Sequence, residues 1–269
     1  MPLYLVNKSN NMTFIKSEMV GGVLKLTLNR PDKFNSFNRE MAFELQAALD
    51  QAASEKSIRA VLLTGEGKAF CAGQDLSEAI DANGPGIDRI VKEHYNPTIL
   101  KIRRLEKPVV CAVNGVAAGA GANIALACDI VIAGASVAFI QAFSKIGLIP
   151  DSGGTFILPR LVGFGKASAL MMLGDKVSAT DAERMGMIYK VVADEILQEE
   201  GMEVAKKLSE LPTKALGLTK KLLSNSSFST LDNQLIAEAH EQVKAAKTYD
   251  YSEGVNAFLE KRKPVFKGE

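Results

Sequence analysis

The stretch KPVVCAVNGVAAGAGANIALACDI, residues 107–130, carries the pattern that decides the fold. It begins with an apolar, β-branched run and continues through a bend rich in glycine and alanine. A helix-like segment follows, and then a second β-branched run that reaches residue 134. A buried strand, a crossover helix and a second buried strand account for this order, and such crossovers join parallel strands. The stretch therefore predicts an α/β protein with a mostly parallel sheet.

The same alternation of strand and helix patterns continues upstream of this stretch. Residues 21–31, GGVLKLTLNRP, alternate apolar and polar side chains and stop at a proline, as a half-buried strand does. Residues 58–67, IRAVLLTGEG, form another β-branched run that ends at glycine. Between them, Asn38 stands at the N-cap position of a segment, 39–56, with apolar residues at helical spacing. We expect two further strands joined by a helix.

The last third of the chain changes character. From about residue 195, three amphipathic segments follow one another without a strand: 195–211, 213–226 and 229–250. Helices appended to an α/β core often cover a neighbouring surface, so we expect them to serve oligomerisation. The expected organisation is an N-terminal extension at 1–12, an α/β core at 13–200 and a helical region at 201–269.

Composition and charge narrow the class of function. The 269 residues are 47% apolar and 23% charged, which is ordinary for a globular protein. A formal net charge of +1 provides no global field for nucleic acid or an anionic membrane. Three cysteines without paired spacing and two separated histidines provide no zinc-type ligand set, so we expect no metal. Reduced thiols and the absence of a secretory signal favour the cytoplasm.

Two glycine-rich segments are candidate sites for an anion. Residues 113–126 follow a strand and open a helix, but Ile124 stands where a dinucleotide fingerprint needs its third glycine. Backbone N–H groups at such a helix start stabilise a negative oxygen, including one that develops during a reaction. Residues 68–76, KAFCAGQDL, also let a ligand approach the backbone closely. Tight packing explains both segments equally well.

A third segment, GLIPDSGGT at 147–155, places Asp151 beside Ser152. A serine nucleophile needs a histidine, and only His94 and His240 exist, both in polar, helix-like sequence. Pro150 also stands where a hydrolase elbow needs glycine. Asp151 is either a general acid or base, or the cap of a helix that starts near Ser152.

These segments, taken in order with NRPDKFNSFN at 29–38 and GVNAFLEKRKPVF at 254–266, resemble the crotonase superfamily of enoyl-CoA hydratases and isomerases. The resemblance covers residues 13–269. It implies a spiral of ββα units, a helical C-terminal trimerisation region, and a homotrimer or dimer of trimers. It also implies an acyl-CoA thioester substrate, with coenzyme A as part of the substrate and no other cofactor.

The resemblance also implies which residues form the site. The thioester oxygen would lie between the backbone N–H groups of Gln74 and Ala120; the family commonly has glycine at the second position. The substrate would be bound by Lys33, Ala72, Gln74, Asp75, Leu76, Gly121, Asn123 and Phe143, and, from a neighbouring subunit, by Phe258 and Lys261. A solvated basic helix face explains Phe258 and Lys261 equally well.

The same resemblance separates two reactions. Hydratases of the family use two glutamates, and their positions hold Asn123 and Phe143 here, neither of which exchanges a proton. Isomerases place one acid near Asp151, where burial in an apolar pocket should raise its pKa. We therefore expect an isomerase with Asp151 as acid and base. Residues 114–123 (NGVAAGAGAN), 142–155 (AFSKIGLIPDSGGT) and 183–192 (ERMGMIYKVV) resemble the ring-1,2-epoxyphenylacetyl-CoA isomerase branch, whose members open an aromatic epoxide or shift enoyl-CoA double bonds. The alternatives are a hydratase, an acyl-CoA-binding scaffold subunit without activity, and a serine hydrolase.

Overall fold

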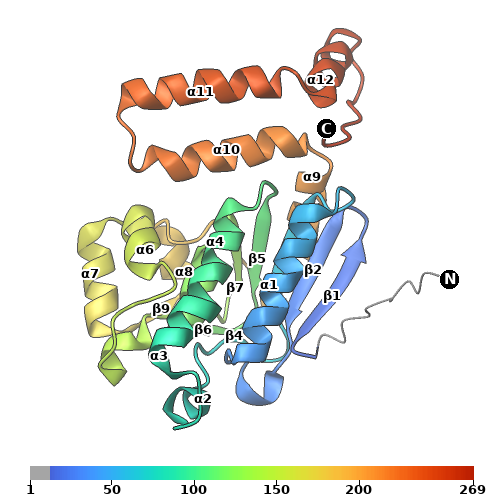
Figure 1. Cartoon of the computed structure of the whole chain (residues 1–269). Helices are drawn as coiled ribbons and strands as arrows, with labels where there is room; N and C mark the ends of the chain where they lie inside the picture. The colour runs from blue at the N-terminus through green and yellow to red at the C-terminus, as the bar shows by residue number, and fades with distance from the viewer. Residues whose placement is uncertain (1–12) are drawn as a thin grey trace, which may run out of the picture.

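The computed structural model describes residues 13–269 (Figure 1). The expected N-terminal extension, 1–12, lies outside these described residues. The chain folds into two β-sheets covered by helices, with a pair of long helices lying above one end of the larger sheet. The α/β class predicted from the sequence is confirmed.

The larger sheet has six strands in the order β1-β2-β3-β5-β7-β10. Its strands are β1 (Ile15–Val20), β2 (Val23–Leu28), β3 (Ala60–Gly65), β5 (Val109–Val113), β7 (Ile130–Gly134) and β10 (Lys190–Val192). β1 and β2 pair antiparallel, and every other neighbouring pair is parallel. The four strands expected from the sequence are β2, β3, β5 and β7, and they lie side by side. The prediction of a mostly parallel sheet is therefore confirmed.

The smaller sheet was not foreseen from the sequence. Its strands are β4 (Ala69–Cys71), β6 (Val116–Ala118), β8 (Ala138–Ile140) and β9 (Lys176–Ser178), in that order. Each has three residues, which is too short for a periodic pattern to identify. The pairs β3–β4, β5–β6 and β7–β8 each place one strand in the larger sheet and the next in the smaller. This repeat is the spiral that the family resemblance implies.

Helices cover both faces of the larger sheet. On one face lie α1 (Arg39–Ser54), α4 (Asn96–Arg104) and α5 (Ala120–Leu126). The Asn38 side chain accepts a hydrogen bond from the Met41 N–H, so the predicted N-cap of α1 is confirmed. On the opposite face, α9 (Leu197–Ser209) packs Leu197 and Ala205 against β-strand residues such as Leu62. The remaining helices are α2 (Leu76–Ile80), α3 (Gly86–Arg89), α6 (Gly154–Val162), α7 (Phe164–Leu173), α8 (Ala179–Arg184), α10 (Thr213–Ser226), α11 (Leu231–Ala245) and α12 (Tyr249–Leu259).

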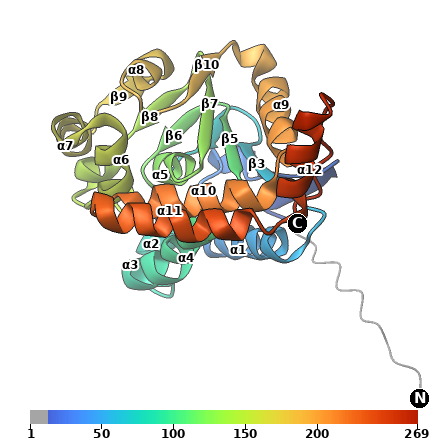
Figure 2. The ribbon, with the colours of Figure 1, turned by 90° about the horizontal axis from the view of Figure 1, so that it is seen from above.

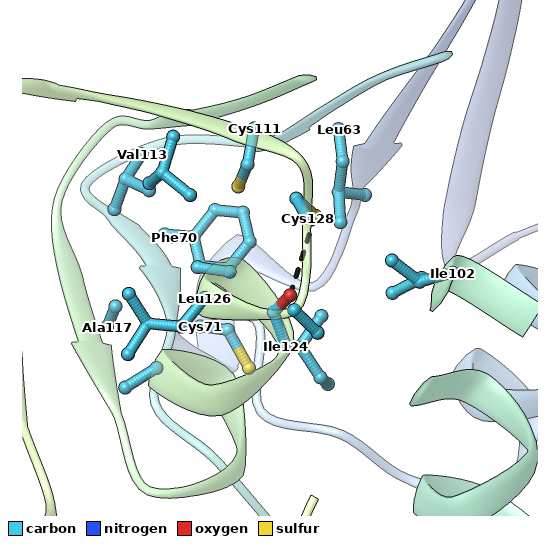
Figure 3. Close-up of a cluster of buried hydrophobic side chains, with 14 of the residues drawn as sticks. Leu63, Phe70, Cys71, Ile102, Cys111, Val113, Ala117, Ile124, Leu126 and Cys128 are labelled. Carbon is cyan, nitrogen blue, oxygen red and sulfur yellow. Dashed lines mark hydrogen bonds between the residues drawn. The ribbon is translucent and has the colours of Figure 1, made fainter. Parts of the chain in front are cut away.

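The core between the two sheets is apolar and contains all three cysteines (Figure 3). Phe70 of β4 lies among Cys71, Cys111 and Cys128. The cysteines are free thiols, and the Cys128 thiol donates a hydrogen bond to the Ile124 carbonyl at 3.5 Å. This packing joins β4, β5 and α5 into one unit, and the site described below stands on that unit.

The C-terminal helices differ in two ways from the pattern expected. α9 packs on the larger sheet, so the expected boundary at residue 200 falls inside a core helix. The segment 229–250 breaks after α11, because Thr248 accepts a hydrogen bond from the Tyr251 N–H and caps a new helix, α12. α10 and α11 run antiparallel across the top of the core (Figure 2). No helix among residues 13–269 is long and apolar enough to cross a membrane.

Candidate active site

A cavity of about 220 Å³ lies where β4 and β6 end and α5 begins. Its walls come from four parts of the chain: residues 72–79, 87–95, 119–120 and 142–151. Most lining side chains are apolar, and the charged ones are Asp151 and Lys145. Gln74, Ala120 and Asp151, predicted from three separate segments, all line this cavity. The structure thus brings the two expected N–H donors and the expected acid together.

Two glycines bring the donor segments close to each other. Gly73 has φ +94°, and a Cβ built there would lie 3.0 Å from the Ala118 carbonyl oxygen and 3.7 Å from the Ala120 nitrogen. Gly119, with φ +53°, is the N-cap of α5, so Ala120 starts the helix. Both backbone conformations are ones that residues with a Cβ rarely adopt. The chain therefore needs glycine beside each donor, and the predicted donors themselves need only their N–H groups.

The N–H groups of Gln74 and Ala120 are available to a ligand. Phe37 forms a bridge with the Gln74 segment by donating to the Gly73 carbonyl at 2.7 Å and accepting from the Asp75 N–H at 2.8 Å. In this pattern the Gln74 N–H points away from Phe37. Within residues 13–269, neither the Gln74 nor the Ala120 N–H donates a hydrogen bond. Two unused donors at the wall of one cavity can stabilise a developing oxyanion.

The Gln74 side chain is fixed by a residue that the sequence analysis missed. The Tyr95 hydroxyl donates to Gln74 Oε1 at 2.7 Å, and Gln74 Nε2 donates to Glu78 Oε2 at 2.7 Å. Tyr95 ends a π-helical turn, Ile90–Tyr95, and lines the cavity while burial raises its pKa well above the usual value. π-helical turns often occur at functional sites. The segment 77–100, which shapes the pocket, carried no readable periodic pattern for this contact.

The Asp151 carboxyl is partly buried and does not cap a helix. Burial raises its pKa, while a hydrogen bond from the Ser152 hydroxyl to Asp151 Oδ1 at 2.9 Å partly opposes that shift. α6 begins at Gly154 with Gly153 as its N-cap, and no side chain caps it. α6 thus starts near Ser152, as expected, although Ser152 itself adopts a left-handed conformation with φ +51°. The alternative in which Asp151 caps this helix is wrong, so its carboxyl remains available to a ligand in the cavity.

Asn123 was expected to contact the substrate, but its side chain lies behind the cavity wall. Its side chain is 1% exposed and does not line the cavity. It donates to the Asp151 carbonyl at 2.9 Å and accepts from Gln141 Nε2 at 2.8 Å. The amide therefore holds the backbone of Asp151 from behind and does not contact the cavity. Phe143, which the resemblance places at the second glutamate position of the hydratases, does line the cavity.

Of the other predicted binding residues, some line the cavity and others have a structural role beside it. Ala72 and Leu76 line it. Asp75 is paired with Arg30 at 2.9 Å and caps α2. Gly121 lies beneath the donors, where a Cβ would come within 2.4 Å of the Cys71 carbonyl oxygen, so for this glycine tight packing is the explanation.

The remaining predicted residues do not line this cavity in the chain itself. Lys33 is exposed at the end of a 3₁₀ turn, Pro31–Lys33. Phe258 is 82% exposed on α12, and Lys261 follows that helix. Figure 1 shows α12 at the opposite end of the molecule from α2 and α3. Within one chain these two residues therefore lie away from the cavity.

In the described part of the chain, no histidine is placed to act as a general base for Ser152. Ser152 is 1% exposed, and its hydroxyl donates to Asp151. His94 Nε2 lies 3.4 Å from an Arg39 nitrogen, and His240 lies beside Glu241. A hydrolase dyad needs a direct hydrogen bond between serine and histidine. The geometry therefore does not support the serine hydrolase alternative.

Comparison with known proteins relates nearly the whole chain to one family. The family model described as enoyl-CoA hydratase/isomerase matches residues 18–269. The 1,2-epoxyphenylacetyl-CoA isomerase of Escherichia coli (strain K12) is 49% identical over 261 residues, covering 96% of this chain and 100% of that protein. A Rhodobacter capsulatus protein named "Probable enoyl-CoA hydratase" is 43% identical over 254 residues, covering 94% and 98%. The crystal structure of an enoyl-CoA hydratase from Bacillus anthracis matches with a TM-score of 0.91 at 36% identity, covering 95% and 100%.

Proposed function

The chain belongs to the enoyl-CoA hydratase/isomerase family, and we propose that it works there as an isomerase of acyl-CoA thioesters. The observation that carries the proposal is the composition of the cavity wall. Asp151 is the one carboxylate among the described residues that line it, and it faces the same cavity as the two N–H donors. Adding water across a double bond calls on two proton-exchanging groups, whereas moving a proton along a chain needs one.

The proposed reaction uses the oxyanion donors and the carboxylate in turn. The Asp151 carboxylate removes a proton from the carbon beside the thioester carbonyl, and the electron pair of that C–H bond moves onto the carbonyl oxygen. The N–H groups of Gln74 and Ala120 stabilise the resulting enolate. When the electrons return, the double bond moves into conjugation with the thioester, and Asp151 gives its proton to the carbon two positions further along. Atoms and charge balance without another cofactor.

The raised pKa of Asp151 suits both halves of this cycle. A carboxyl whose pKa is raised by burial holds a proton more firmly, so it is a stronger base than an exposed aspartate. It remains a competent acid once protonated, because its pKa lies nearer to neutral pH than that of an exposed aspartate. The apolar walls account for the raised pKa, because a charged carboxylate is poorly solvated among apolar side chains.

Two acyl groups fit the proposal. The first is a straight-chain 3-enoyl thioester, which would be converted to the 2-enoyl form. The second is the 1,2-epoxyphenylacetyl group, supported by the relative of that activity at 49% identity. Opening a ring epoxide to an oxepin rearranges bonds without net gain or loss of protons. A cavity whose described lining residues include one carboxylate is compatible with either substrate.

The assay that tests the proposal compares two substrates with the same enzyme. Crotonyl-CoA reports hydration by loss of enoyl absorbance, and a 3-enoyl-CoA reports isomerisation by its gain. We expect isomerisation to be faster than hydration by at least about a hundredfold, since the second acid is missing. Hydration as fast as isomerisation would favour the hydratase activity named for the relative at 43% identity. Binding of acyl-CoA without turnover of either substrate, or of the ring epoxide, would favour a scaffold role.

We also propose that the protein is a homotrimer or a dimer of trimers. α10, α11 and the turn between them expose several large apolar side chains, among them Leu223, Phe228, Leu231, Leu235 and Ile236. Large exposed apolar patches commonly mark an interface between subunits. In such an assembly Phe258 and Lys261 of one copy would contact the CoA part of a substrate bound to its neighbour.

A further inference from the structure

A second and larger cleft lies at the other end of the molecule from the thioester cavity. Its volume is about 760 Å³, and none of its lining residues lines the thioester cavity. One wall is the end of the α/β core, where α1 and α4 terminate, and the other wall is formed by α10 and α11 and the C-terminal segment. Figure 1 shows α10 and α11 lying above these helix ends. We call it the basic cleft because of the charges described next.

The basic cleft concentrates positive charge that the chain as a whole does not have. Nine lining side chains are lysine or arginine, and three are glutamate. Over the complete sequence, 32 lysine and arginine residues stand against 31 aspartate and glutamate residues. The core wall contributes Lys56, Arg59, Arg104 and Lys107. Cations on two facing walls repel each other, so this arrangement is most stable when an anion lies between them.

Two of the cations on the core wall, Arg59 and Lys107, form hydrogen bonds that stabilise the fold. Arg59 donates to the Phe266 carbonyl at 2.7 Å and the Leu211 carbonyl at 2.6 Å, and Lys107 donates to the Glu55 carbonyl at 2.7 Å. These bonds tie the core to the C-terminal segment and close the end of α1. The partners are carbonyls and not carboxylates, and burial lowers the pKa of both Arg59 and Lys107, so we assign these two groups to holding the fold and not to the ligand.

Four cations at the rim have no such explanation. Lys56 and Arg104 on the core wall, and Lys214 and Lys247 on the helical wall, are exposed. Among residues 13–269, none of the four side chains forms an ion pair or a hydrogen bond. Of the three glutamates that line the cleft, Glu241 is already shared by Lys221 and Lys244, while Glu106 and Glu269 form no ion pair among the described residues. The rim therefore holds an excess of positive charge, with cations on both sides of one opening.

We propose that the basic cleft binds a small organic polyphosphate of nucleotide size, separately from the thioester cavity. Its volume lies within the range of about 300–1,000 Å³ that is usual for small-molecule sites. Lysine and arginine side chains are the usual protein partners of phosphate groups. No aromatic side chain lines the cleft within the described chain, so recognition rests on the phosphates and not on stacking of a base. This inference is independent of the reaction proposed above.

Titration calorimetry on the full-length protein tests the proposal with ATP and with inorganic tripolyphosphate, both without magnesium. We expect both anions to bind at low salt and to bind more weakly as salt rises, because the attraction is electrostatic and screened. Equal affinities would show that the cleft recognises phosphate alone, and tighter binding of ATP would show that the nucleoside adds contacts. No binding of either anion at low salt would overturn the proposal.

The double variant Lys214→Glu/Lys247→Glu locates the binding. Both residues are exposed, and Glu at the second position of α10 is favourable near a helix start, so folding should be retained. We expect its affinity for tripolyphosphate to fall by at least about tenfold, while turnover of acyl-CoA is unchanged. The matched control, Lys166→Glu/Lys176→Glu, reverses two exposed lysines outside the cleft and should bind as the native protein does. Equal loss in both double variants, or in neither, would refute a site in the cleft.

A variant on the opposite wall gives a second, independent readout. Lys56→Gln/Arg104→Gln removes two rim charges without introducing negative ones. We expect weaker binding of tripolyphosphate and a smaller dependence of affinity on salt, because fewer charge pairs form. Unchanged affinity and unchanged salt dependence in this variant would show that the two walls do not act together, which contradicts the proposal.

Discussion

At the scale of single residues, the sequence predicts which segments line the cavity better than it predicts the orientation of each side chain. Asp151, Gln74 and Ala120 were expected in one site, and all three line one cavity. Asn123 was expected to contact substrate, yet it is buried behind Asp151. Position along a helix specifies the element that carries a side chain, and packing with distant segments decides which side it faces. Tyr95 was missed for the same reason, since its partner Gln74 lies in another segment.

The raised pKa of Asp151 predicts a pH-dependent gain in stability when the charge is removed. Because the pKa of Asp151 is raised in the folded state, its ionisation lowers the free energy of unfolding. This loss is complete at pH values above the folded-state pKa and absent at pH values below the unfolded-state pKa of about 3.9. Asp151→Asn should therefore increase the free energy of unfolding in urea at pH 7, and the gain should shrink as pH falls toward about 4.

Asp75→Asn is a control variant for which we expect the opposite change in the free energy of unfolding. Burial alone would raise the pKa of Asp75, but bonds from Ser77 and Arg30 outweigh it and lower that pKa. Its charge therefore stabilises the fold above the unfolded pKa, so this variant should lose stability at pH 7. A loss of stability in Asp151→Asn as well would contradict the burial that we assign to Asp151.

Tyr95→Phe tests whether the Gln74 side chain is positioned by the hydroxyl. The variant removes one hydrogen bond without opening a cavity, so the free energy of unfolding should fall by about 1 kcal/mol. Because the Gln74 segment becomes less fixed, kcat for isomerisation should fall while KM changes little. Tyr189→Phe, at a tyrosine that is 66% exposed, should change neither quantity. An unchanged kcat in Tyr95→Phe would exclude the positioning role.

At the scale of elements, the long periodic segments were predictable and the short ones were not. α1 and the four neighbouring parallel strands follow from apolar patterns that extend over several residues. The three-residue strands of the smaller sheet and the π-helical turn at Ile90–Tyr95 depend on contacts between distant segments. The site stands on these short elements, which is why its donors were located by family resemblance and not by pattern.

The contact between β4 and α5 is the element-level requirement of the site, and Gly121→Ala tests it. A Cβ at Gly121 would lie 2.4 Å from the Cys71 carbonyl oxygen, closer than real Cβ atoms come, so the two donor segments must move apart. Overpacking of this kind costs about 1–3 kcal/mol, and isomerisation should fall with it.

Gly165→Ala is the matched substitution, because Gly165 is also the second residue of its helix and a Cβ there meets nothing within 4 Å. It should raise the free energy of unfolding by about 0.5–1 kcal/mol and leave activity unchanged. A similar loss of stability in both variants would show that the effect at Gly121 is not steric.

At the scale of the whole molecule, the two hollows lie at opposite ends of one core. The thioester cavity stands where the β4 and β6 strands end, and the basic cleft lies where the helices of the core end beneath α10 and α11. The residues of the first cavity were predicted through the family resemblance. The sequence did not predict the second, because the basic residues come from five separated segments that only the fold brings together.

The assembly is tested by sedimentation equilibrium. With a chain mass of 28.9 kDa, we expect three or six copies in the native protein. Leu231→Glu/Leu235→Glu places charges on the apolar face of α11 and should shift the mass toward one copy, since a buried unpaired charge opposes association. Met19→Glu, at an exposed methionine of β1, should leave the mass unchanged. A native protein with the mass of a single chain would contradict the proposed assembly.

The most direct test of the central claim is the rate at which Asp151→Asn isomerises a 3-enoyl-CoA under saturating substrate. Asparagine nearly preserves the shape of the side chain but cannot take up and return a proton. We expect kcat to fall by about a thousandfold, within the range known for general acid–base groups, while acyl-CoA still binds with the native Kd. Isomerisation by the variant at a rate within a few-fold of the native enzyme would contradict the account.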